Sequence, residues 1–136
     1  MSLNPRVVES FNRQSMMTTL GALLVRAEPG VVEIDLPFRS TLSQQHGFIH
    51  AGAITSVVDS ACGYAALTQA PEGKEVVTVE FKVNFIRPAQ GQLFKETGTV
   101  INAGRNIAVC SGAVVAWLDT GDTKLVAQMQ ATMAFV

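Results

Sequence analysis

Hydrophobic and polar residues alternate along several segments of the chain, and this alternation predicts β-strands. The clearest case is residues 77–85, in which every second residue is apolar: Val77, Val79, Phe81, Val83 and Phe85. We expect a long strand there with that face buried. The other predicted strands, bounded by turn residues such as Gly, Pro, Asn and Asp, are 20–27, 31–38, 91–102, 106–118 and 124–136.

Two other segments follow a helical pattern. Residues 51–68 carry apolar or small side chains nearly all round a helix, which predicts a long buried helix that ends before Pro71 and Gly73. Residues 4–17 begin with a cap candidate, Asn4, and continue with apolar residues at helical spacing, which predicts a short amphipathic helix. The element order therefore indicates an α+β fold, with an antiparallel sheet and a helix on one face.

The length of 136 residues suits one domain, and we expect a single domain over residues 1–136. A net charge of −1 gives no basic surface for nucleic acid. No apolar run approaches the roughly 20 residues of a membrane-spanning helix, and the first residues lack a signal-peptide pattern, so we expect a cytoplasmic protein. Cys62 and Cys110 lack zinc-site spacing and are expected to be small buried residues.

One ionisable residue interrupts the long apolar helix. Asp59 lies between Val58 and Ser60, where an isolated carboxylate is costly to bury. Ionisable groups in such settings are concentrated at functional sites, so Asp59 is the candidate catalytic residue. Alternatively, it faces solvent or an interface, or it accepts a hydrogen bond from Ser56 or Thr55 one turn earlier.

The segment before this helix, residues 44–52, is polar and contains glycine. Free backbone N–H groups at a helix start, together with the helix dipole, can hold an oxyanion or a thioester carbonyl. Asp59 lies eight residues after Ala51, about 12 Å along the helix axis. Both can act on one small group only if a two-fold dimer brings Asp59 of one chain opposite the helix start of the other. His46 and His50 are four residues apart, but Gly47 and the absence of a third ligand argue against a metal site.

The sequence His50-Ala51-Gly52, with Asp59 nine positions after His50, resembles the HGG-and-Asp signature of PaaI-like acyl-CoA thioesterases, in the hotdog-fold 4-hydroxybenzoyl-CoA thioesterase superfamily. Gly47 also matches, as does the strand over residues 76–85 that is followed by Arg-Pro-Ala. The chain departs from the pattern at two positions: Ala51 replaces the first glycine, and Gln44 stands where some relatives have asparagine.

The resemblance implies a sheet wrapped around the long helix, a dimer (or a dimer of dimers) formed through the strand that follows that helix, and active sites at the interface. It implies that Asp59 is the nucleophile or the base that activates water, that the Ala51 N–H polarises the thioester carbonyl, and that Thr78 helps to position water. Gln44 takes the place of an Asn that contacts the carbonyl or the water. The residues implied to contact the acyl-CoA substrate are His50, Gly52, Glu80, Phe85, Asn102, Gly104, Arg105 and Asn106.

The implied activity is hydrolysis of an aryl, medium-chain or long-chain acyl-CoA to the free acid and CoA, without a metal or redox cofactor. A hotdog hydratase that acts on an enoyl thioester is an alternative, but such enzymes typically pair a His with the carboxylate, and no His follows Asp59. A module that binds or senses acyl-CoA without consuming it is the other alternative. Asp59 argues against it, because binding alone does not need a carboxylate in an apolar helix.

Overall fold

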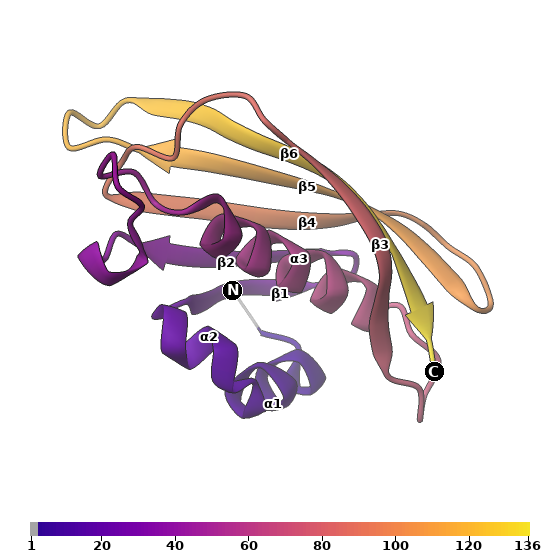
Figure 1. The fold of residues 1–136 in the computed structure, drawn as a ribbon. Helices are drawn as coiled ribbons and strands as arrows, with labels where there is room; N and C mark the ends of the chain where they lie inside the picture. The colour runs from indigo at the N-terminus through magenta and orange to yellow at the C-terminus, as the bar shows by residue number, and fades with distance from the viewer. Residues whose placement is uncertain (1–2) are drawn as a thin grey trace.

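A computed structural model describes residues 3–136, and it contains one six-stranded antiparallel sheet with the strand order β1-β2-β4-β5-β6-β3. The strands are β1 (Leu23–Glu28), β2 (Val31–Pro37), β3 (Val76–Phe85), β4 (Leu93–Ala103), β5 (Ile107–Trp117) and β6 (Thr123–Phe135). The sheet curves around the long helix α3 (Ala51–Leu67), as Figure 1 shows. The predicted α+β architecture is confirmed.

Helix α3 is buried against the concave face of the sheet because small residues let the two backbones approach closely. Gly98 of β4 faces Ala61, and a Cβ atom at Gly98 would lie 2.4 Å from the Ala61 carbonyl carbon. Only glycine permits this contact. Cys62 and Cys110 are both buried as expected, and burial raises the pKa of the Cys110 thiol to about 11, so it stays protonated.

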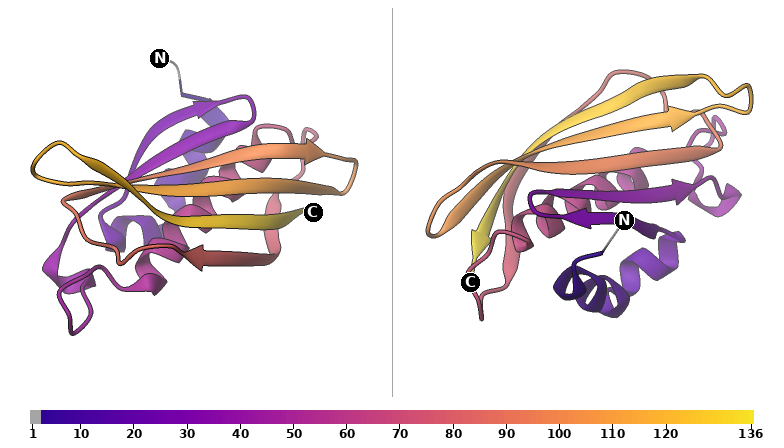
Figure 2. Two further views of the ribbon diagram at one scale, coloured as in Figure 1. Left: turned by 90° about the horizontal axis from the view of Figure 1, so that it is seen from above. Right: turned by 180° about the vertical axis from the view of Figure 1, so that it is seen from behind.

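The N-terminal segment differs from the single helix predicted over 4–17. It forms two helices, α1 (Pro5–Arg13) and α2 (Ser15–Leu20), because Gln14 between them is extended, with φ −83° and ψ 100°. Asn4 caps α1 as predicted, since its side chain accepts hydrogen bonds from the first amides of the helix. Gly21, with φ 77°, ends α2, so the strand predicted from residue 20 begins at Leu23. Figure 2 shows both helices on the same side of the sheet as α3.

The buried face predicted for residues 77–85 is not present in the single chain. β3 forms one edge of the sheet and pairs with β6, and within residues 3–136 no strand pairs with its other edge. Val77, Val79, Phe81 and Phe85 are all exposed. An exposed edge strand with four large apolar side chains is a surface on which another chain can pair.

A β-bulge in β3 also breaks the predicted alternation. Between Thr78 and Glu80 the register shifts by one residue, and Val79 has no partner on β6. Directly opposed residues share a face of the sheet, so Thr78, opposite the buried Met133, points toward α3. The bulge therefore places a hydroxyl on the face where the sequence pattern predicted an apolar residue.

α3 has 17 residues. No helix within residues 3–136 is long and apolar enough to cross a membrane.

Candidate active site

Asp59 and Thr78 form a hydrogen-bonded pair between α3 and β3. Thr78 Oγ1 donates to Asp59 Oδ1 at 2.8 Å. Of the two alternative partners one turn earlier, Ser56 is engaged elsewhere, because its Oγ donates to the Gly52 carbonyl at 2.8 Å. Within residues 3–136, no hydrogen bond joins Thr55 to Asp59. Partial burial raises the pKa of Asp59 above its usual value, and the Thr78 hydrogen bond offsets part of that rise. The site thus combines a half-buried carboxylate with a neutral donor that favours its ionised form.

The start of α3 leaves one backbone donor free. His50 caps the helix, and its Nδ1 accepts from the Gly52 N–H at 2.7 Å. The amides of Ile49 and His50 donate to Ala89 and Leu42. Within residues 3–136, the Ala51 N–H has no hydrogen-bond partner. The donor predicted at Ala51 is therefore available.

The replacement of glycine by Ala51 costs no backbone strain. No non-glycine residue between 3 and 136 has a positive φ, so Ala51 does not need the left-handed conformation that favours glycine. Its side chain is exposed at the first position of α3.

Gln44 lies on the same cavity as Ala51. Its Oε1 accepts from the amides of His46 at 2.6 Å and Phe48 at 3.3 Å, which fixes the side chain within its loop. Its Nε2 donates to no group of residues 3–136. Gln44, Ala51 and Phe85 line one open cavity of about 400 Å³. Three of the predicted site residues are thus brought together at the start of α3.

His50 and Gly52 flank Ala51 at the start of α3, whereas the other predicted residues lie apart from this cavity within one chain. Asp59 is about two turns further along α3 than Ala51, as the spacing predicted. The turn that follows β4 lies near the other end of α3 (Figure 1). The Asn106 carbonyl in this turn accepts a hydrogen bond from the amide of Phe135, and Phe135 pairs with Val76 at the start of β3. That turn contains Gly104, Arg105 and Asn106, whereas Asn102, predicted to lie in it, is the penultimate residue of β4. All four residues are exposed. Glu80, opposite Thr132, is exposed on β3.

Comparison with known proteins identifies the family. Residues 46–121 match the thioesterase superfamily. The chain belongs to the thioesterase superfamily. A thioesterase family protein from Silicibacter pomeroyi has a solved structure that is 44% identical, covers 96% of each chain and superposes with a TM-score of 0.94. The proofreading thioesterase EntH of Klebsiella pneumoniae is 24% identical over 94 residues, 69% of each chain.

The hotdog fold of this superfamily member is confirmed. The E. coli PaaI protein from the phenylacetic acid degradation operon is only 18% identical, but it covers 99% of this chain and 96% of its own with a TM-score of 0.85. The predicted PaaI-like hotdog thioesterase is therefore correct at the level of family and fold. Membership of the superfamily supports thioester hydrolysis as the general activity.

One buried carboxyl group of the chain was not predicted from the sequence. Glu96 of β4 is fully buried, and within residues 3–136 neither of its carboxyl oxygens makes a hydrogen bond of normal geometry. Burial raises the pKa of Glu96 well above its usual value, and the negative charge of Asp35 adds to the rise. The backbone amide of Val58, which is close to the carboxyl group, lowers the pKa and offsets part of the rise. The signal was present in the sequence, because Glu96 falls between Phe94 and Gly98 on the buried face of an alternating strand.

Replacing Glu96 by methionine is expected to stabilise the protein, and more so at higher pH. The unfolded chain loses the Glu96 proton above the usual pKa while the folded chain keeps it, so this residue lowers stability as pH rises toward the raised folded pKa. We expect the free energy of unfolding to rise by about 1–3 kcal/mol at about pH 8 and by less at about pH 5, measured by urea denaturation. Glu9→Met on the exposed face of α1 is the control, with an expected change within about 0.5 kcal/mol. An equal gain at both pH values would rule out titration of Glu96 as the cause.

Proposed function

We propose that this chain hydrolyses acyl-CoA thioesters to the free acid and CoA, with Asp59 as the nucleophile or general base. The observation that carries the proposal is the Asp59–Thr78 pair, a half-buried carboxylate whose second oxygen is not engaged by any group of residues 3–136. Thr78 holds the carboxylate in place and, through its hydroxyl, contacts the water that attacks the thioester. A thioester carbonyl is electrophilic and a thiolate leaves readily, so one carboxylate and one donor for the oxyanion suffice.

The free Ala51 N–H supplies the oxyanion donor in this proposal. It lies at the first position of α3, where the helix dipole adds positive potential. Water attacks the carbonyl carbon, its proton passes to Asp59, and the carbonyl oxygen becomes an oxyanion at Ala51. The C–S bond then breaks, the acid is released, and the CoA thiolate takes up a proton.

A two-fold dimer through β3 brings these groups together. In an antiparallel pairing of two β3 strands, the Thr78 end of one strand lies beside the Phe85 end of the other. Thr78 binds Asp59, whereas Phe85 lines the cavity with Ala51. The pairing therefore brings Asp59 of one protomer toward the partner's Ala51, and it covers the exposed apolar side chains of β3.

The same pairing explains the position of the predicted CoA-binding turn. The turn with Arg105 lies near the start of β3, so in the dimer it reaches the partner's Ala51 cavity rather than its own. Arg105 is exposed and suits a phosphate of CoA.

The proposal is tested by thiol release from aryl, medium-chain and long-chain acyl-CoAs. We expect release above the uncatalysed rate for at least one acyl class, and release about 10²–10⁴-fold slower with Asp59→Asn. Binding of acyl-CoA without release from any of them would instead identify a sensing module.

A further inference from the structure

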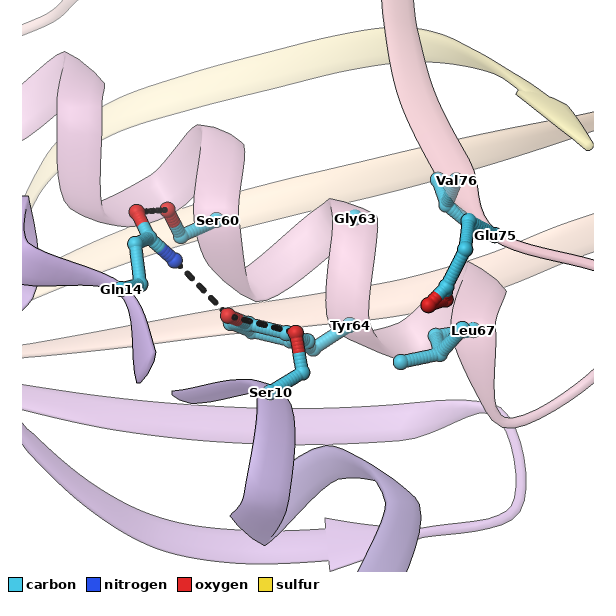
Figure 3. A pocket seen from close by; sticks show the side chains of 8 residues that line it. All are labelled: Ser10, Gln14, Ser60, Gly63, Tyr64, Leu67, Glu75 and Val76. Atoms are coloured by element: carbon cyan, nitrogen blue, oxygen red, sulfur yellow. Dashed lines mark hydrogen bonds between the residues drawn. The ribbon is translucent and has the colours of Figure 1, made fainter. Parts of the chain in front are cut away.

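A second cavity lies one helical turn beyond Asp59, between α3, the α1–α2 junction and the start of β3 (Figure 3). Its volume is about 310 Å³. We infer that this cavity receives the far end of the acyl group, and that Gly63 and Tyr64 determine which acyl groups are accepted. The inference rests on the proposed function, since it takes Asp59 as the position of the thioester.

The position and size of the cavity suit a short acyl group. Gly63 follows Asp59 by four residues, so both lie on one face of α3, about 6 Å apart along the axis. A chain of about five or six carbons spans that distance from a carbonyl at Asp59. The volume is at the lower end of the range of ligand sites, which run from about 300 to 1,000 Å³. A long acyl chain is therefore not fully enclosed.

Gly63 has no structural reason to be glycine in the single chain. Glycine inside a helix is less favourable than alanine by about 0.5–1 kcal/mol. A Cβ atom at Gly63 would meet no atom within 4 Å, and its φ is not positive. By contrast, Gly98 is required by close contact with α3. Because Gly63 lines the cavity, its missing side chain leaves space for a ligand.

One wall of the cavity is polar, and its side chains are joined to one another by hydrogen bonds. The Tyr64 hydroxyl accepts from Gln14 Nε2 at 2.8 Å and lies 3.3 Å from Ser10 Oγ. Gln14 Oε1 in turn accepts from Ser60 Oγ at 3.2 Å. Figure 3 shows these side chains on one side of the cavity. The break between α1 and α2 at Gln14 is what brings this amide to α3, so the wall is a built feature of the fold.

The remaining wall adds apolar contact and one negative charge. Leu67 and Val76 line the cavity, and Figure 3 shows the Glu75 carboxylate on their side of it. Glu75 forms no ion pair within residues 3–136. A neutral hydroxyl at the end of the acyl group can accept a hydrogen bond from the Tyr64 hydroxyl and donate one to the Glu75 carboxylate. A terminal carboxylate is instead repelled by Glu75. The preferred substrate is thus a short acyl-CoA with a neutral hydrogen-bonding group at its far end.

The test measures binding by isothermal titration calorimetry, using thioether analogues of CoA that cannot be hydrolysed: ethyl-, hexyl-, ω-hydroxyhexyl- and ω-carboxypentyl-CoA. The wild type is expected to bind ω-hydroxyhexyl-CoA about tenfold more tightly than hexyl-CoA, and the carboxylate analogue more weakly than either. Tyr64→Phe should remove the preference for the hydroxyl. Gly63→Leu should weaken both hexyl analogues about tenfold and leave ethyl-CoA, which is too short to reach the cavity, unchanged.

Gly63→Ala is a milder variant that tests the same position if Gly63→Leu does not fold. It should give a smaller loss for the hexyl analogues together with an equal or higher melting temperature, since alanine favours the helix. Equal effects of the Gly63 variants on ethyl- and hexyl-CoA, no preference for the hydroxyl, or no binding of any analogue by the wild type would overturn the inference. Failure of the proposed function is distinguished by the thiol-release assay, because the binding assay needs no turnover.

Discussion

Asp59→Asn is expected to lower the rate of acyl-CoA hydrolysis by about 10²–10⁴-fold, the range of a positioned acid–base group. Asparagine has nearly the same shape and can still accept a hydrogen bond from Thr78, so the contact between α3 and β3 is kept. It cannot attack the thioester as a carboxylate or take a proton from water. The loss should therefore be in kcat, measured by steady-state thiol release, while the melting temperature stays close to that of the wild type.

The pH profile separates a catalytic carboxylate from a structural one. Because burial raises the pKa of Asp59, the acid limb of the wild-type profile should lie above the usual aspartate range. Thr78→Val has almost the same volume but removes the donor that lowers this pKa, so its acid limb should move to higher pH. Near wild-type rates in Asp59→Asn, or an acid limb unaffected by Thr78→Val, would remove this pair from the mechanism.

Ala51→Pro is expected to lower kcat by about 10²–10³-fold, the cost of losing one oxyanion donor. Proline lacks the backbone N–H but is well tolerated at the first position of a helix, where Ala51 lies. The preceding residue must be extended, and His50 already is, with φ −58° and ψ 137°. The substitution thus removes one donor with little disturbance of the helix.

The control for this loss is Ala51→Gly, which restores the family's glycine and keeps the N–H. We expect it to retain activity within a few-fold of the wild type, because Ala51 needs no positive φ. Melting temperatures of both variants check that α3 remains folded. Full activity in Ala51→Pro would show that the oxyanion is held elsewhere.

Much of the fold was predictable because the patterns that define it are local. The apolar residues around 51–67 predicted α3 almost to the residue, and turn residues set the strands of the second half within a few positions. The sequence predicted one N-terminal helix instead of two because the break at Gln14 depends on distant partners, Tyr64 and Ser60. A local helical pattern contains no information about such contacts.

The candidate site was predictable only in part, for the same reason. Asp59 was identifiable as a carboxylate in an apolar helix, but its contact with Thr78 depends on the bulge in β3. Strict alternation places Thr78 on the opposite face. The Ala51 N–H has no partner among residues 3–136 because of the hydrogen bonds that His50 and its neighbours make, and these contacts are not visible in the sequence. Glu96 was missed because a single glutamate in a strand is normally assigned to the solvent face.

The most direct test of the shared site is the activity of a mixed dimer that pairs an Asp59→Asn chain with an Ala51→Pro chain, co-expressed with different affinity tags and purified through both. Each homodimer lacks one required group at both sites and should be nearly inactive. If Asp59 works with the partner's Ala51, the mixed dimer has one site with both groups replaced and one with both native, so about half of the wild-type rate per dimer should return. A mixed dimer no more active than the two homodimers would contradict a site shared between protomers.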